Sequence, residues 1–95
     1  MLFKSIDERI KELGFEKIDD NDHVVSYERK IKDNSNKILY TQVVDIYHKH
    51  NGKHLMLSYD KNLFDDKNIG NICVGLTYTE AKLFLKKMKS KKWKS

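Results

Sequence analysis

The chain contains no proline and only one cysteine, Cys73, among its 95 residues. A single cysteine excludes an internal disulfide, and the N-terminal segment becomes charged at Lys4 before an apolar signal core has formed. We therefore expect a cytoplasmic protein. No apolar run approaches the roughly 18 residues that a membrane span needs, so a membrane-spanning protein is excluded as well.

Glycine is also scarce, and the four glycines form no phosphate-binding loop. Gly70 and Gly75 lack both the spacing and the following Lys-Ser or Lys-Thr pair of such a loop. The acidic pairs at positions 19–20 and 65–66 lie in polar segments, whereas catalytic acids need a rigid and partly desolvated position. Cys73 is flanked by apolar residues and is expected to be a small buried side chain. We therefore predict that the protein is not an enzyme and uses no cofactor.

Positive charge is concentrated at one end of the chain. The net charge is +5, but residues 86–95 hold six lysines and no acid, which leaves 13 basic against 14 acidic side chains in residues 1–85. The body of the protein is thus nearly neutral. Such asymmetry indicates an anionic partner, for example nucleic acid, an acidic protein or a membrane surface.

The lysine-rich end is the most distinctive feature of the sequence. Lysine side chains neutralise phosphates and release counterions, and a tryptophan ring stacks on an unpaired base. A helix C-terminus, however, favours cations through its dipole, and a polar tail increases solubility without any partner. The nucleic-acid interpretation and the interpretation without a partner both stay open. In the second, the tryptophan folds back onto the preceding helix. The candidate residues for binding nucleic acid or an acidic partner are Lys82, Lys86, Lys87, Lys89, Lys91, Lys92, Trp93 and Lys94.

Two amphipathic helices are predicted near the ends of the chain. Apolar residues at positions 3, 6, 10 and 13 share one helical stripe, which predicts a helix over 2–13 with Gly14 as its left-handed C-cap. A capping box that starts at Ser5 leaves a later beginning open. A second capping box at 77–80, with an apolar stripe at 78, 81, 84, 85 and 88, predicts a helix over 78–89. Residues 1–89 then form one domain, and residues 90–95 form a basic tail.

Strands are predicted between the two helices. Val25, Tyr27 and Ile31 alternate with polar residues, and a second strand over 37–50 has an apolar face of the same period. Turn residues at 33–36 join these strands, and pairing Ile31 with Ile38 and Val25 with Val44 aligns their apolar faces.

The next turn is predicted at Asn51-Gly52, because both residues tolerate the positive φ of a two-residue type I′ hairpin. This turn pairs Ile46 with Leu57 and Val44 with Tyr59. Residues 61–71 are expected to form a loop, and residues 72–74 a short fourth strand. The predicted fold class is α+β, an antiparallel three- to four-stranded sheet flanked by N- and C-terminal helices.

The C-terminal helix also resembles known proteins. Residues 74–88 read VGLTYTEAKLFLKKM. This stretch resembles the C-terminal helices of short, uncharacterised proteins from phages and prophages of AT-rich Gram-positive bacteria. The resemblance implies an accessory protein of a mobile element, and it implies no reaction and no site residues.

Three of the four histidines lie close together, at His48, His50 and His54. Clustered imidazoles are the usual ligands of zinc, nickel and copper. In the two-residue hairpin, however, His48 and His50 point to one face of the sheet and His54 to the other. A three-residue turn would place His48 opposite His54 but would misalign the apolar faces. We therefore predict no metal site and a fold that needs no metal.

The second face of the sheet is expected to be open and partly apolar if both helices cover the first. Such a patch is typical of a protein contact or of self-association, although scattered apolar residues shielded by lysine stems are equally compatible. The candidate interface residues are Leu39, Val43, Tyr47 and Met56. The sequence thus predicts a small non-enzymatic binding or accessory protein that acts through protein contacts. The alternative is a nucleic-acid-binding module that uses the lysine-rich helix and tail.

Overall fold

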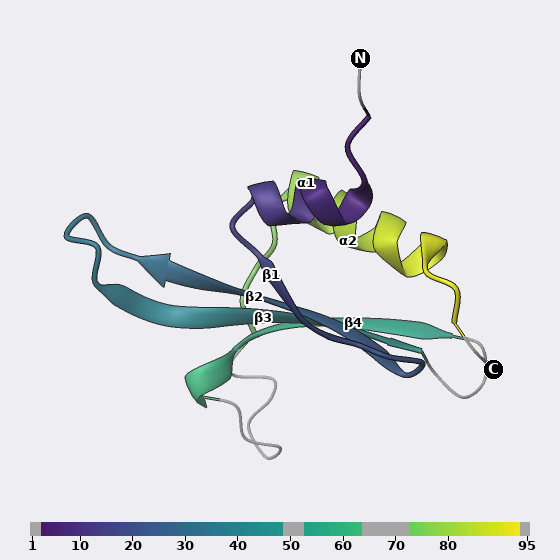
Figure 1. Cartoon of the computed structure of the whole chain (residues 1–95). Coiled ribbons are helices and arrows are strands. Elements are labelled where there is room, and N and C mark those ends of the chain that lie inside the picture. Colours follow the sequence, from purple (N-terminus) through teal and green to yellow (C-terminus); the bar gives the residue numbers. More distant parts are fainter. Residues whose placement is uncertain (1–2, 49–52, 64–72, 94–95) are drawn as a thin grey trace.

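The computed structural model describes residues 3–48, 53–63 and 73–93 as two helices lying on one face of an antiparallel sheet (Figure 1). The strands follow the order β1-β2-β3-β4, and each neighbouring pair is antiparallel. The predicted α+β class is therefore confirmed. Within these ranges, no helix has the length and apolar character needed to cross a membrane. The elements are α1 (Ile6–Glu12), β1 (Glu16–Asp20), β2 (Val24–Lys32), β3 (Ile38–His48), β4 (His54–Asp60), the 3-10 helix η1 (Lys61–Leu63) and α2 (Tyr78–Ser90).

Helix α1 begins one turn later than its apolar periodicity predicts. The hydroxyl of Ser5 accepts a hydrogen bond from the Glu8 amide at 3.1 Å, so the later start indicated by the capping box is correct. Phe3 lies before the helix and is 87% exposed, which contradicts its predicted place on the apolar stripe. After the helix, Gly14 adopts φ 96°, and a β-carbon there would lie 3.2 Å from Cδ of Arg29. The predicted left-handed glycine is confirmed.

Helix α2 starts at the predicted capping box, and it buries Phe84 of the predicted stripe but is rotated so that part of that stripe is exposed. The Thr77 hydroxyl accepts from the Glu80 amide at 3.1 Å, and the Glu80 carboxylate accepts from the Thr77 amide at 2.8 Å. Leu83 is buried, whereas Tyr78, predicted on the apolar stripe, is 78% exposed. The rotation follows from Glu80, because its carboxylate also pairs with Arg29 of β2 at 2.7 Å and turns that side of the helix toward the sheet.

One hydrophobic core lies between the helices and the sheet. The ring of Phe84 on α2 meets the ring of Phe15 edge-on, with 5.1 Å between centroids, and lies 5.5 Å from the ring of Tyr27. Edge-to-face contacts of this kind stabilise aromatic pairs beyond the area they bury. The other buried members of the core are Ile10, Val25, Val44, Ile46 and Leu83.

Strand β1 was not predicted from the sequence. All five of its residues are exposed, and Ile18 is the only apolar one, so no alternating pattern marks it. The strand forms because buried Phe15 anchors the chain beside β2, whose edge then pairs with it. The predicted fourth strand at 72–74 amounts, in the residues described, to an isolated bridge between Tyr59 and Cys73. The predicted loop begins with η1, and residues 64–71 lie outside the described ranges.

The β2–β3 register differs from the prediction by two residues. Val25 pairs with Ile46 and Tyr27 with Val44, and a bulge lies between Ile31 and Lys32. Because side chains alternate with a period of two, this shift leaves each of these side chains on its predicted face. The face assignment of these strands is confirmed, although the predicted pairs are wrong.

The β3–β4 register differs by one residue, which has the opposite effect. Ile46 pairs with Met56 and Val44 with Ser58, so the predicted pairs with Leu57 and Tyr59 are wrong. A one-residue slip exchanges the two faces of a strand. Met56 therefore packs against the core beneath the helices, whereas Leu57 turns to the other side of the sheet. The turn residues 49–52 lie outside the described ranges.

Candidate functional site

The β2–β3 hairpin projects beyond the rest of the sheet as a two-stranded arm, defined here as residues 29–41 (Figure 1). β1 pairs with β2 only as far as Glu28, and β4 pairs with β3 only from Gln42 onward. Among the described strands, the two strands of the arm thus pair only with each other. Leu39 is 58% exposed and Ile38 46%. The arm presents free backbone edges together with apolar side chains, a combination that favours pairing with another chain.

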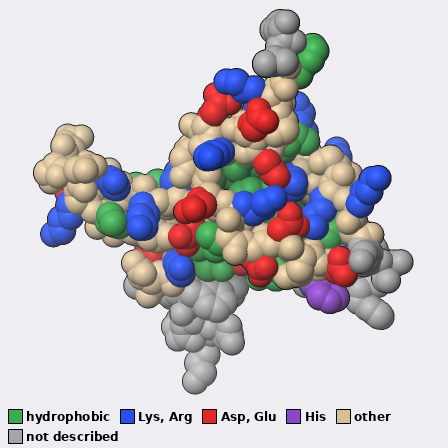
Figure 2. All heavy atoms as spheres, viewed as in Figure 1, with side chains coloured by type: hydrophobic (Ala, Val, Ile, Leu, Met, Phe, Trp, Pro, Cys, Tyr) green, Lys and Arg blue, Asp and Glu red, His purple; other side chains and the backbone are tan. Residues whose placement is uncertain are grey.

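The arm is positively charged (Figure 2). Lys30, Lys32 and Lys37 are exposed along it. Its one acid, Asp33, accepts hydrogen bonds from the Ser35 hydroxyl at 2.7 Å and amide at 2.8 Å, and from the Lys37 amide at 3.0 Å. The hydrogen bond from the Ser35 hydroxyl has the largest effect, and together these bonds hold the pKa of Asp33 below its usual value. Asp33 therefore shapes the turn, and the lysines set the charge of the arm.

The four predicted interface residues do not form one surface. They are Leu39, Val43, Tyr47 and Met56. Met56 lies under the helices because of the register slip. Val43, which pairs with Glu28 and Tyr59 in the sheet, is only 3% exposed within the chain itself, so its predicted accessibility is wrong. Leu39 is the exposed member of the set, and it belongs to the arm.

The face of the sheet opposite the helices carries a buried carboxylate that the sequence analysis missed. Asp45, 4% exposed, accepts hydrogen bonds from the hydroxyls of Ser26 at 2.6 Å, Tyr59 at 2.7 Å and Tyr47 at 3.0 Å. Burial and the bond to Asp45 raise the pKa of Tyr47 to about 12. The same causes raise the pKa of Tyr59. The partners come from three different strands, so no local spacing reveals the cluster. Its hydroxyls already satisfy the carboxylate, which fits a structural role.

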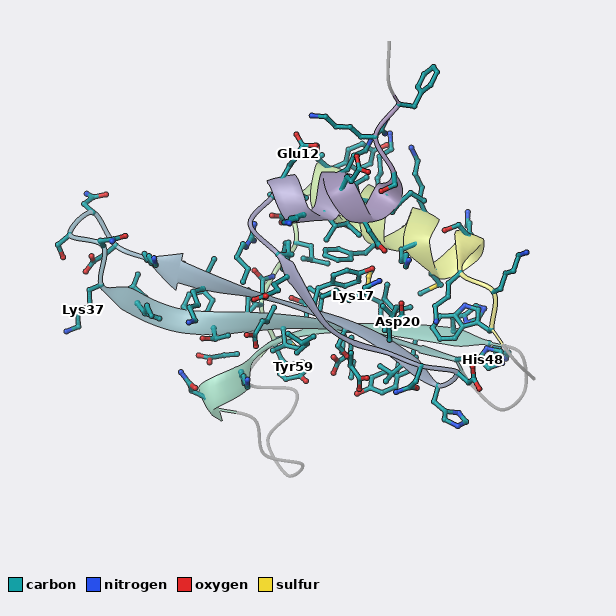
Figure 3. The ribbon with its side chains drawn as sticks, viewed as in Figure 1. Glu12, Lys17, Asp20, Lys37, His48 and Tyr59 are labelled. Carbon is teal, nitrogen blue, oxygen red and sulfur yellow. The ribbon has the colours of Figure 1, made fainter. Side chains whose placement is uncertain are left out.

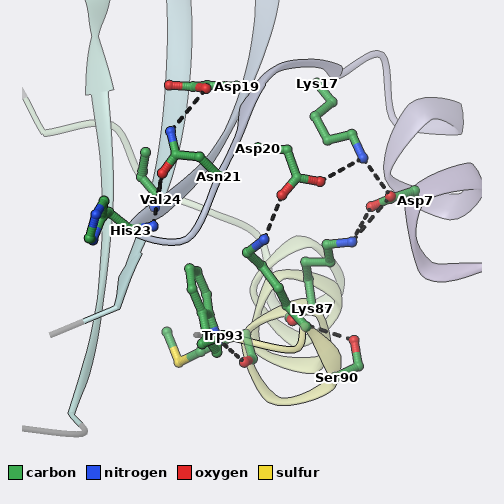
Figure 4. A network of polar contacts seen from close by, with 12 residues as sticks. Asp7, Lys17, Asp19, Asp20, Asn21, His23, Val24, Lys87, Ser90 and Trp93 are labelled. Carbon is green, nitrogen blue, oxygen red and sulfur yellow. Dashed lines mark hydrogen bonds and ion pairs between the residues drawn. The ribbon is translucent and has the colours of Figure 1, made fainter. Parts of the chain in front are cut away.

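Part of the lysine-rich end faces inward (Figure 4). Lys87 pairs with Asp7 at 3.1 Å, and Lys91 pairs with Asp20 at 2.6 Å. Lys17 links the two acids, with 3.1 Å to each. Burial pushes the pKa of Asp7 up, but hydrogen bonds from one tyrosine and two lysines outweigh this effect and hold the pKa below its usual value. Lys87 and Lys91 thus join α2 to α1 and β1, and their charges are already paired.

Trp93 also lies against the protein. Its Nε1 donates a hydrogen bond to the Met88 carbonyl at 3.0 Å. Its ring stacks on His48, with 5.3 Å between centroids and 10° between planes, and packs against the hydrophobic core. Of the interpretations left open above, the structure shows the one in which Trp93 folds back. Lys91 and Trp93, assigned to a tail from the sequence, therefore contact the domain, and Lys94 lies outside the described ranges.

The remaining lysines of this end are exposed. Lys82 and Lys86 line a groove of about 390 Å³ between α1 and α2, with Arg9 on the facing helix and Tyr78 in the wall. The ammonium of Lys82 lies 5.2 Å from the ring centroid of Tyr78. The sequence analysis missed Arg9 and Tyr78, the latter because it matched the apolar stripe of the helix. The exposed lysines are Lys82, Lys86, Lys89 and Lys92.

Two histidines predicted to lie on opposite faces are side by side. His48 pairs directly with His54, and their ring centroids are 5.2 Å apart. The predicted separation of these histidines followed from a two-residue hairpin register, and that register is wrong. No cluster of three or more His, Cys, Asp or Glu side chains able to hold a metal occurs in the described part of the chain, and His50 lies outside it.

Cys73 differs from its prediction as well. It is exposed, because it lies at the edge of the sheet beyond β4, where it bridges to Tyr59. The apolar neighbours in the sequence did not indicate this position, since the strand they suggested is reduced to a single bridge. The prediction that Cys73 is a small buried side chain is therefore wrong.

Comparisons with models of known protein families, with curated protein sequences and with solved structures found no match for this chain. The resemblance to phage and prophage proteins stays a prediction. The function is therefore argued from the surfaces described above.

Proposed function

We propose that the protein is a small non-enzymatic binding protein, an accessory factor of a phage or other mobile element, that holds an acidic segment of a protein partner on its β2–β3 arm. One observation carries this proposal. Leu39 and Ile38 are 58% and 46% exposed on an arm whose strands, among those described, pair only with each other. An apolar strand edge left open in this way is an aggregation hazard unless a partner covers it.

Strand addition explains how the arm would bind. An extended partner segment adds to an open edge, where main-chain hydrogen bonds supply affinity and alternate side chains supply specificity. Lys30, Lys32 and Lys37 surround this edge and favour acidic side chains in the partner, since complementary charge raises the rate of association. The net charge of +5 acts in the same direction.

A first prediction concerns Leu39→Asp. Loss of the exposed apolar side chain and the introduction of a charge that repels an acidic partner are expected to weaken partner binding at least about tenfold, a loss of about 1.4 kcal/mol. The immobilised protein is used to capture the partner from lysate of the producing cells, and affinity for the purified partner is then measured. The matched control is Leu85→Asp, because Leu85 is 41% exposed and belongs to α2 and not to the arm.

The same proteins can also be used to distinguish binding of a partner protein from self-association of the chain. Analytical ultracentrifugation of the wild type shows whether the arm joins two copies of the chain. If the wild type and Leu39→Asp bind the captured partner equally tightly, the arm is not the binding surface and the proposal is wrong.

A second candidate function is binding of single-stranded nucleic acid in the α1–α2 groove. The observation that favours it is the exposed ring of Tyr78 beside Lys82, with Lys86 and Arg9 lining the same groove. An aromatic ring among cations is the usual platform for a stacked base. This site differs from the predicted one, because Trp93 is packed against the domain.

A second prediction concerns binding of single-stranded nucleic acid in the groove. With Lys82, Lys86 and Arg9 of the groove engaged, log K against log salt is expected to have a slope of about −2 on single strands. Tyr78→Ala is expected to weaken binding by about 1–3 kcal/mol, and Tyr40→Ala on the arm by much less. Fluorescence anisotropy of a labelled oligonucleotide measures both. Absence of binding at about 50 mM salt, where phosphate contacts are strong, excludes this function.

A further inference from the structure

The β3–β4 ladder ends in a closely spaced pair of imidazoles. The His48 amide donates to the His23 carbonyl of the chain preceding β2 at 2.9 Å, so it points away from β4. His48 and His54 are therefore a non-hydrogen-bonded pair of the β3–β4 ladder, the kind in which facing side chains lie closest. Their ring centroids are 5.2 Å apart, and their planes meet at 39°.

Both rings carry an unpaired polar atom. Nδ1 of His48 and Nδ1 of His54 are buried and have no hydrogen-bond partner in the described structure. A buried polar atom left unpaired costs about 1–3 kcal/mol, so two of them on facing side chains indicate a ligand between or beside the rings. Neutral imidazole nitrogen is a preferred ligand of zinc, copper and nickel.

The spacing of the rings fits a metal ion. Two imidazoles that hold an ion at about 2.1 Å with a tetrahedral angle leave their ring centroids roughly 5 Å apart. The observed 5.2 Å agrees with this separation. Trp93 supports the arrangement, because its ring stacks on His48 and lies 5.4 Å from His54, which holds both imidazoles in place.

We propose that His48 and His54 together bind a divalent late first-row transition-metal ion, Ni²⁺, Cu²⁺ or Zn²⁺. Among the described residues, no third protein ligand joins them, and water would fill the remaining coordination positions in this proposal. The ion is therefore exchangeable, unlike a closed four-ligand structural zinc. It links β3 to β4 at the end of the sheet opposite the tip of the arm, where Figure 3 places His48 and Lys37 respectively. The proposal does not depend on the function of the arm.

The single tryptophan provides the test. Trp93 is the only indole in the chain and lies against both histidines, so Ni²⁺ or Cu²⁺ bound there is expected to quench its fluorescence. We expect saturable quenching at one ion per chain, with any affinity tag removed, and its reversal by excess Zn²⁺. Binding should weaken as the pH is lowered, because protons compete with the metal ion for the imidazole nitrogens. Zn²⁺ should also raise the melting temperature, since a ligand of the native state stabilises it.

Variants decide whether these two histidines are the ligands. His48→Gln and His54→Gln are each expected to weaken Ni²⁺ binding at least tenfold, whereas His23→Gln, the matched control on the neighbouring turn, should leave it unchanged. Circular dichroism confirms that each variant is folded. Unchanged binding in both ligand variants, or no saturable quenching with millimolar Ni²⁺, overturns the proposal.

Discussion

Replacement of Arg29 by alanine is expected to lower the free energy of unfolding by about 3–5 kcal/mol, because it leaves a buried carboxylate without its counter-ion. The guanidinium pairs with Glu80 at 2.7 Å, and the Glu80 side chain is only 8% exposed. The Arg29 guanidinium also donates to the Leu13 carbonyl at 3.1 Å and to the Gln42 side chain at 2.8 Å. Arg29 thus ties the end of α1 and the start of α2 to β2 and β3 at the base of the arm. Urea denaturation measures the loss.

Two further variants test this interpretation. Lys30→Ala, an exposed neighbour on the same strand, is expected to change the free energy of unfolding by less than about 0.5 kcal/mol. Adding Glu80→Gln to Arg29→Ala should recover part of the loss, since the unpaired charge is then removed. If Arg29→Ala costs no more than Lys30→Ala, the buried ion pair does not hold the helices on the sheet.

Trp93→Ala is expected to lower the free energy of unfolding by about 2–3 kcal/mol, as the loss of a large, partly buried side chain predicts. The ring packs on the core and on His48, and its Nε1–H is bonded to the Met88 carbonyl. A solubilising tail would give no such loss. Thermal and urea denaturation both report it, and Lys92→Ala, an exposed neighbour, is the matched control with little expected effect.

This result also bears on nucleic-acid binding. A Trp93→Ala variant with the stability of the wild type would mean that the ring is free, and stacking on a base would then become the better account of it. If the variant is destabilised as expected, a loss of nucleic-acid binding in it cannot be read as lost stacking. Tyr78→Ala then becomes the informative variant, because that ring is 78% exposed.

The arm and the histidine pair can be tested separately, because they lie at opposite ends of the sheet (Figure 3). Leu39→Asp should leave Ni²⁺ binding unchanged, and His54→Gln should leave partner binding unchanged. If both variants impair both activities, the cause is unfolding rather than a local contact.

Local sequence determined the features that depend on neighbouring residues alone. The N-cap at Ser5 and the capping box at Thr77 begin the two helices because their partners lie three residues along the same chain. Gly14 takes the left-handed conformation that the end of α1 requires. The faces of β2 and β3 followed from strict alternation, which survives a two-residue error in register.

Tertiary structure decided the features for which the local pattern was silent or ambiguous. β4 has apolar residues on both faces, at Leu55, Met56 and Leu57, so alternation could not select its register, and the core selected Met56. β1 has no pattern at all and forms because β2 offers it an edge. Both candidate sites likewise depend on the tertiary structure. A one-residue change of register brings His48 beside His54. The arm has open edges because β1 and β4 end before the arm begins. The relative lengths of the strands across the sheet decide this, and no single segment of the sequence encodes it.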